Sequence, residues 1–148
     1  MDAAVRRSDL RCVSLRPSWV QHEGNYERNL GPQLRDPYRP NPGLWSYIDV
    51  YDLADAIVLA VESGLAGHEV FGIASPDNAG NRDLADLITT VYGDAIPVRP
   101  LSRPDASGIW CGKAVRMLGW RPSRSWRDYL DEDGRARKAA APGEGGGL

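Results

Sequence analysis

Cysteine is scarce in this sequence, in which Cys12 and Cys111 are the only two thiols among 148 residues. They lie about a hundred positions apart with no second pair beside them, so they supply neither a disulfide framework nor the ligands of a tetrahedral metal site. We therefore expect two reduced thiols, no bound metal and a cytoplasmic location.

An excess of basic charge is also absent. The chain carries 18 Lys and Arg residues against 20 Asp and Glu residues, a formal net charge of −2. Nucleic acids and anionic membrane surfaces both require a basic face on their partner. We therefore expect no nucleic acid and no membrane among the partners.

Long hydrophobic runs are lacking as well. The longest apolar run, residues 54–61, is interrupted by Asp55 and is far too short to span a bilayer. No apolar segment has the character of a signal peptide. These features predict a soluble protein.

The chain does contain enough apolar residues for one folded domain, with 42% hydrophobic content, five Trp and six Tyr. Its central stretch runs from Trp45 to Glu62, where a short strand passes directly into a helix with apolar residues at helical spacing. We expect Asp52 to cap this helix, because its carboxylate can accept hydrogen bonds from the first turn. Capping explains Asp49, Asp52 and Asp55 more simply than a metal site does.

The other periodic segments predict an α/β fold with too few strands for a doubly wound sheet. Residues 1–130 form the expected folded portion, and residues 131–148 form a disordered tail because they are rich in Ala, Gly and charge. Residues 1–7 read as the end of a helix. Strands are expected at 10–15, 68–73 and 96–98; helices are expected at 26–34, between Asn81 as cap and Gly93, and at 112–118; and a last short element is expected at 125–130.

Four segments taken in series resemble a known family. They are Leu15-Arg16-Pro17, Tyr47 to Ala56, Glu69 to Ile73, and Lys113-Ala114 with Leu118 to Pro122. In this order and spacing they resemble the carboxyl-terminal part of extended short-chain dehydrogenase/reductases, the NAD-dependent epimerase/dehydratase family. The resemblance implies an incomplete Rossmann-type sheet with a small substrate-binding α/β lobe. It also implies NAD or NADP in the intact enzyme and a small-molecule substrate, often a nucleotide sugar.

The catalytic motifs of that family are missing from this chain. No glycine-rich turn follows a strand and opens a helix, as a dinucleotide pyrophosphate requires. No Tyr has a Lys four residues later, and the only lysines are Lys113 and Lys138. We therefore expect no catalytic residue, no cofactor bound by this chain alone, and a fragment or truncated product. The alternative is a non-catalytic interaction module that pairs with a separate Rossmann half.

The resemblance also suggests binding residues. Pro17, Ser18 and Trp19 match the loop beside the nicotinamide ring, although packing at a strand end explains them almost as well. Trp19 stands where many nucleotide-sugar enzymes have Asn, which suggests a different substrate shape. The expected substrate-binding residues are Trp19, Val20, Tyr26, Trp45, Tyr47 and Arg103.

Arg103 and Asp105 resemble an Arg-x-x-Asp segment that clamps a diphosphate, with the spacing one residue shorter. An arginine suits bidentate phosphate contact. An exposed arginine in a proline-rich loop is more often simply solvated, so both interpretations stay open. The clamp is incomplete in any case, because Trp45 stands where sugar-nucleotide enzymes often have an arginine.

Overall fold

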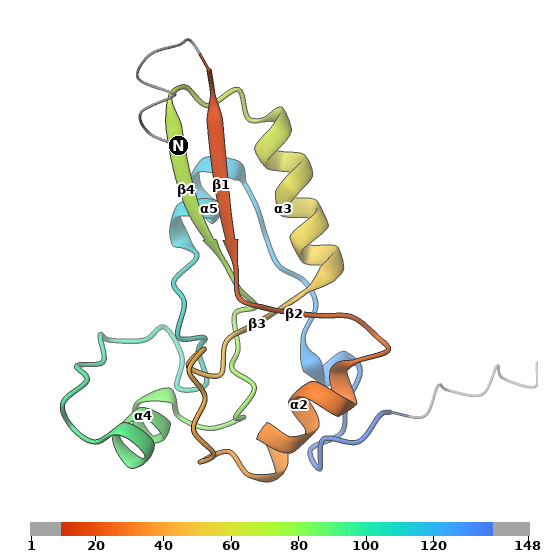
Figure 1. The fold of residues 1–148 in the computed structure, drawn as a ribbon, viewed down its shortest axis with the longest axis vertical. Helices are drawn as coiled ribbons and strands as arrows, with labels where there is room; N and C mark the ends of the chain where they lie inside the picture. Colours follow the sequence, from red (N-terminus) through yellow and green to blue (C-terminus); the bar gives the residue numbers. More distant parts are fainter. Residues whose placement is uncertain (1–9, 138–148) are drawn as a thin grey trace, which may run out of the picture.

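The computed structural model describes residues 10–137 and shows a mixed α/β chain (Figure 1). The α/β class expected from the sequence is confirmed. The elements in chain order are β1 (Cys12–Pro17), β2 (Trp19–Gln21), α2 (Tyr26–Arg35), β3 (Tyr47–Asp49), α3 (Val50–Glu62), β4 (His68–Ile73), α4 (Leu84–Tyr92), α5 (Gly112–Leu118) and the 3-10 turn η1 (Trp126–Asp128).

The strands form two small parallel sheets. β1 pairs with β4, from Cys12 opposite His68 to Pro17 opposite Ile73, and β2 pairs with β3. Helix α3 packs on β1, α5 packs on β4, and the two helices also contact each other (Figure 1). No second strand in the described part of the chain pairs with the far edge of β1, so this edge stays open.

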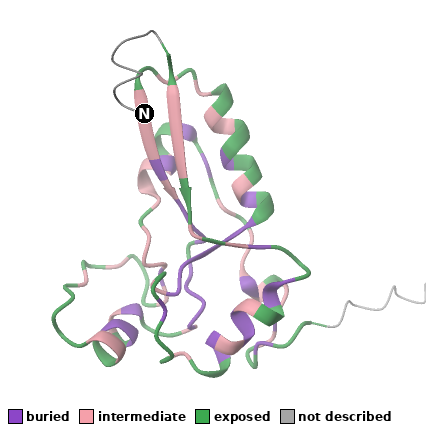
Figure 2. Cartoon of the chain, in the orientation of Figure 1, coloured by how far each residue is buried: buried purple, intermediate pink, exposed green. Residues whose placement is uncertain are grey.

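Two regions with separate hydrophobic cores follow from this arrangement. We call β1, β4, α3 and α5 the sheet layer, and α2, α4, η1 and their connecting loops the lobe. Strand β3 joins them, because successive side chains on a strand point to opposite sides. Tyr47 packs in the core of the lobe, and Ile48 packs in the core of the sheet layer. Figure 2 shows buried residues concentrated around β3, where the lobe and the sheet layer join.

The helix start in the central stretch differs from the expectation. Asp49 is the N-cap of α3, and its Oδ1 accepts a hydrogen bond from Tyr51 N at 2.9 Å. The expectation that Asp52 caps the helix is therefore wrong. Asp52 is completely buried inside the first turn and accepts hydrogen bonds from Ser123 and Arg124, a segment that only the tertiary structure brings near.

Other elements follow the sequence more closely. β4 and α5 have the predicted bounds, and α2 ends one residue later than expected. The strand expected at 96–98 does not form, because Pro97 and Pro100 remove backbone donors on both sides of Val98. Asp83 rather than Asn81 caps α4, accepting hydrogen bonds from the two backbone N–H groups that follow Leu84.

The described chain continues past residue 130. Asp131 accepts a hydrogen bond from Arg135 N at 2.9 Å through its carboxylate, and Arg137 N donates to Tyr129 O at 2.8 Å. The helix end expected at 1–7 and the remainder of the expected tail, 138–148, lie outside the described residues. No helix in 10–137 is long and apolar enough to cross a membrane.

Candidate functional site

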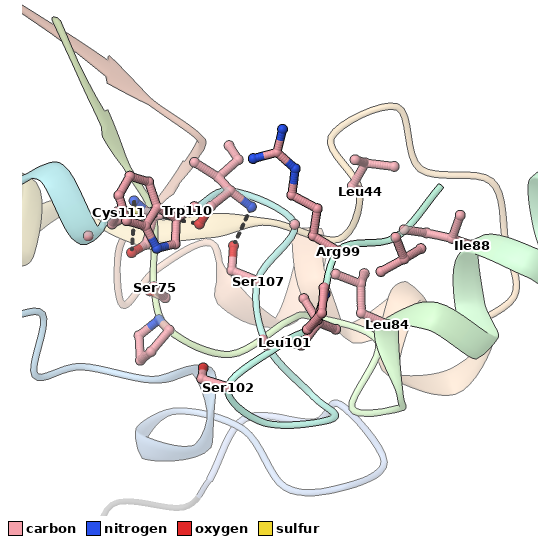
Figure 3. A pocket seen from close by; sticks show the side chains of 18 of the residues that line it. Leu44, Ser75, Leu84, Ile88, Arg99, Leu101, Ser102, Ser107, Trp110 and Cys111 are labelled. Carbon is pink, nitrogen blue, oxygen red and sulfur yellow. Dashed lines mark hydrogen bonds between the residues drawn. The ribbon is translucent and has the colours of Figure 1, made fainter. Parts of the chain in front are cut away.

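A cavity of about 1250 Å³ opens beyond the carboxyl end of β4. Ligand sites in α/β proteins form at this end of parallel strands. The cavity lies between the turn after β4, helix α4 and two irregular segments that precede α5. Figure 3 shows Ser75, Trp110 and Cys111 on one side of it, Leu44, Leu84 and Ile88 on the other, and Arg99 and Leu101 between them. Its lining comes from Leu44, 74–76, Leu84, Ile88, 96–102, 106–112, Val115, Arg121 and Pro122.

Hydrogen bonds hold the segment 106–112 against the end of β4. Ser107 N donates to Pro76 O at 3.0 Å, and Ala74 N donates to Cys111 Sγ at 3.2 Å. Gly108 is required there, because a Cβ at this position would lie 2.7 Å from the Cβ of Leu44. The wall of the cavity is therefore fixed by backbone groups together with the Cys111 side chain.

The polar groups of the cavity are few. Ser75 is 1% exposed, and its Oγ has no hydrogen-bond partner among the described residues. Arg99 and Arg121 also line the cavity. Both are exposed, and neither guanidinium has a hydrogen bond or ion pair within the described part of the chain. No described residue of the lining is acidic.

The described lining holds few groups suited to nucleophilic attack or proton transfer. Burial raises the pKa of the Cys111 thiol, so it stays protonated and is a poor nucleophile at neutral pH. The described lining contains no His, Asp or Glu that could act as a general base. No group of three or more potential metal ligands occurs within residues 10–137.

The expected cofactor residues lie at the neighbouring strand end and not in the cavity lining. Ser18 N donates to Ile73 O at 2.9 Å, which fixes the junction of β1 and β2 beside the end of β4. The Oγ of Ser18 is buried without a partner among the described residues. Trp19 is 45% exposed and Val20 is half-buried. The cofactor role of Pro17 to Trp19 and the substrate role of Trp19 and Val20 stay predictions.

Three aromatic residues expected to contact a substrate are instead part of the core of the lobe. Tyr26, Trp45 and Tyr47 are completely buried. The Tyr26 hydroxyl donates to Asp49 Oδ2 at 2.9 Å, and the Tyr47 hydroxyl donates to Asp77 Oδ1 at 2.7 Å. Burial, together with the adjacent carboxylates, raises the pKa of both phenols. The expectation that these side chains face a ligand is therefore corrected, because large aromatic side chains fill the lobe.

Arg103 also lies outside the cavity lining, and its substrate role stays a prediction. Its guanidinium contacts both carboxylate oxygens of Asp105, at 2.5 and 2.6 Å. This hydrogen bonding lowers the pKa of the Asp105 carboxyl. Asp105 also pairs with Arg127, which in turn pairs with the buried Asp77. The arginine expected to hold a phosphate is thus already paired with carboxylate.

Sequence reasoning missed the residues that do line the cavity. The sequence gives no site prediction for Ser75, and it predicts only a reduced thiol at Cys111. The position of Ala74-Ser75-Pro76 directly after a strand was the one available signal, because the carboxyl edge of a sheet favours ligands. Nothing local connects this turn with Arg99 and Trp110, which reach it through the tertiary fold.

Comparison with known proteins adds a partial match. UDP-glucose 4-epimerase from Corynebacterium glutamicum is 34% identical to this chain over 99 residues. This similarity supports a distant epimerase relationship. The match covers 64% of this chain and 30% of that protein, so the chain spans less than a third of its relative. No protein-family model matches the chain, and no solved structure matches it.

Proposed function

We propose that this chain is the substrate-binding portion of an NAD(P)-dependent epimerase/dehydratase-like oxidoreductase and that it is inactive alone. The similarity to a UDP-glucose 4-epimerase carries the proposal. Support also comes from the parallel pairing of β1 with β4 and from the cavity at the carboxyl end of β4. Without a Tyr-x-x-x-Lys pair the chain positions a substrate but moves no proton for it.

A nicotinamide dinucleotide would supply hydride chemistry in the complete enzyme. The residues of this chain fit only the nicotinamide end of such a cofactor. Ser18 offers a buried hydroxyl without a partner in the described chain, and the partly exposed Trp19 lies next to it. Helix α3 follows β3 directly, and its N-cap is Asp49, whose carboxylate would repel a pyrophosphate at this helix end. The remaining contacts would come from outside this chain.

Two measurements test this proposal. Sequencing the DNA upstream of the codon for Met1 should reveal a reading frame that encodes a glycine-rich strand-to-helix turn and a Tyr-x-x-x-Lys pair. The purified chain, assayed with NAD and UDP-glucose, should show no turnover. Turnover by the chain alone contradicts the inactive state, and an upstream region without these motifs contradicts the role as part of an oxidoreductase.

A second candidate function is a non-catalytic module that docks onto a separate Rossmann half. It is favoured by an apolar stripe on α3, formed by Val50, Ile57, Val58 and Val61, of which Val61 is 81% exposed. Figure 2 shows this outer face of α3 largely as exposed. The open edge of β1 lies next to it, and a groove of about 530 Å³ runs between β1 and α3. Exposed strand edges and apolar faces of this kind recruit partners.

Native mass spectrometry of the chain mixed with a separately encoded Rossmann half tests the second candidate. A defined complex should form, and Val61→Asp should abolish it because the charge would enter the apolar contact. Met117→Asp on α5, where Met117 is 39% exposed, is the matched control and should leave the complex intact. A chain that stays monomeric and monodisperse beside the Rossmann half contradicts this function.

A further inference from the structure

We infer that the cavity beyond β4 takes an amphipathic organic anion, with an apolar body and one anionic group, rather than a nucleoside diphosphate sugar. The inference rests on the proposed function, because it names the class of substrate that this portion would hold. Three independent features of the cavity carry it: the apolar wall, the distribution of arginines and a buried hydroxyl.

The wall of the cavity is predominantly apolar. Leu84 and Ile88 face it from α4, and Ile109 faces it from the segment before α5. Leu84 and Ile88 also belong to the core of the lobe, so this side of the cavity is a continuation of a packed core. A sugar ring presents hydroxyl groups on most of its edges, and an apolar wall leaves them without hydrogen bonds, which opposes binding. The wall therefore selects an aromatic or aliphatic body.

The charge on the cavity has a single sign. Arg99 and Arg121 line it without any partner in the described chain, and the described lining contains no carboxylate. Elsewhere the arginines that approach buried acids are paired: Arg124 with Asp52 at 3.1 Å, and Arg127 with Asp77. A chain with a net charge of −2 therefore leaves unpaired positive charge at this cavity. Guanidinium groups bind carboxylates and similar anions through paired hydrogen bonds.

A diphosphate would need more than this cavity offers. Arg103, the residue best spaced for a phosphate clamp, is held by both oxygens of Asp105 and lies outside the lining. Among the hydroxyl groups of the lining, Ser107 Oγ is already bonded to Ser46 Oγ at 3.0 Å. The described lining therefore offers few free hydroxyl groups to the ribose and sugar rings of a nucleoside diphosphate sugar.

Ser75 supplies a specific polar contact. Its side chain is buried in the wall, and its Oγ has no hydrogen-bond partner among the described residues. A buried hydroxyl without a partner is costly, and a polar atom on a bound ligand removes that cost. Ser75 lies on the β4 side of the cavity and Arg99 further across it (Figure 3), so a ligand that meets both would span the cavity.

Calorimetric titration with two probes of equal shape tests the inference. We use 2-naphthoate as the anion, 2-naphthamide as its neutral counterpart, and UDP-glucose as the nucleotide sugar. The intact chain should bind 2-naphthoate about tenfold more tightly than 2-naphthamide, the ratio expected for a charge-assisted hydrogen bond. It should bind UDP-glucose more weakly than 2-naphthoate.

Variants assign the effect to the cavity. The double variant R99Q/R121Q should bring the affinity for 2-naphthoate down to that for 2-naphthamide, whereas R39Q, an exposed arginine outside the lining, should keep the tenfold ratio. Trp110 lines the cavity, so Trp110→Phe should remove the change in tryptophan fluorescence on binding.

Two results overturn the inference: equal affinity of the intact chain for the two naphthalene probes, and a tenfold ratio that survives in R99Q/R121Q. Tighter binding of UDP-glucose than of 2-naphthoate overturns it as well, and this outcome leaves the proposed oxidoreductase role standing. The proposed role fails on different observations, namely turnover by the chain alone or an upstream region without the catalytic motifs.

Discussion

The lobe and the sheet layer satisfy their polar and apolar groups in different ways. In the lobe, the buried carboxylate of Asp77 accepts hydrogen bonds from Tyr47, Ser125 and Arg127. In the sheet layer, the far edge of β1 has no partner strand in the described chain, and α3 exposes Val61 and its apolar neighbours. The buried carboxylate of the lobe thus finds its partners within the same chain. The sheet layer, in contrast, exposes a strand edge and apolar side chains of the kind that proteins usually cover.

This difference separates the residues that hold the fold from those that are free to bind. Asp49 and Asp52, the acidic residues for which the sequence offers capping or a metal site, are bonded inside the structure. The cavity holds two arginines without a partner in the described chain, and α3 exposes an apolar face. Buried atoms without a partner among the described residues also occur in the core of the lobe, at the indole nitrogens of Trp45 and Trp126, so the exposure of a group counts together with its lack of a partner.

The largest effect is expected for Asp52→Ala. The buried carboxylate accepts hydrogen bonds from Ser123 N, Ser123 Oγ, Arg124 N and the Arg124 guanidinium. Its removal leaves these donors unpaired, so we expect a loss of about 3 kcal/mol in the free energy of unfolding. Urea denaturation measures this loss. Asp55→Ala on the exposed side of the same helix should change the free energy of unfolding by less than about 0.5 kcal/mol. Equal losses in the two variants would contradict the role of Asp52 in holding the segment at Ser123 and Arg124.

A smaller loss is expected for Tyr47→Phe in the lobe. The hydroxyl donates to Asp77 Oδ1 and accepts from Trp126 N at 2.8 Å. Its removal therefore takes one hydrogen-bond partner from each of these two buried groups. We expect a loss of about 2 kcal/mol in the free energy of unfolding, measured by thermal and urea denaturation. Tyr51→Phe serves as the control, because Tyr51 is 58% exposed. An undiminished stability in Tyr47→Phe would show that the polar network of the lobe does not stabilise it.

High pH should weaken the lobe. Burial is the main cause that raises the pKa of Tyr129 to about 12, and the charge of Asp49 is the second. A phenol with a raised pKa in the folded state binds its proton more tightly there than in the unfolded chain. Its contribution to the free energy of unfolding is therefore complete below pH 10, the ordinary pKa of tyrosine, and is lost as the pH rises to 12. Urea denaturation between these values should show falling stability, and Tyr129→Phe should flatten the slope. An unchanged slope in Tyr129→Phe would assign the loss to other groups.

The smallest effect is expected on the outer face of α3. Val61→Ser should change the free energy of unfolding by less than about 0.5 kcal/mol, because this side chain is already mostly in water. Val13→Ser should cost about 1 kcal/mol, because Val13 packs against the core of the sheet layer. The pair is compared by urea denaturation. A large loss in Val61→Ser would mean that the exposed stripe already stabilises the isolated chain.

Local sequence signals predicted the elements that depend on neighbouring residues. The bounds of β4 and α5 follow from a short apolar run in one case and from Gly119 in a left-handed conformation in the other. The strand expected at 96–98 does not form, because its apolar residues do not compensate for the backbone donors that Pro97 and Pro100 lack. The sequence also predicted the α/β class correctly.

The candidate site could be predicted far less well. Trp45 and Tyr47 stand in a strand, and alternation alone does not tell which face meets a ligand and which meets the core. The cavity joins Ser75, Arg99 and Trp110 from three segments that share no motif. The approach of these three segments depends on tertiary packing, which a local sequence pattern does not encode.

By itself the sequence determined the α/β class, the elements with strong local signals, and the absence of a glycine-rich turn and a Tyr-x-x-x-Lys pair. These properties depend on residues a few positions apart. The tertiary structure alone decided that Asp52 accepts a hydrogen bond from Arg124, 72 positions away. It also decided that two unpaired arginines line the same apolar cavity, because burial and charge pairing between distant residues arise only when their segments pack together.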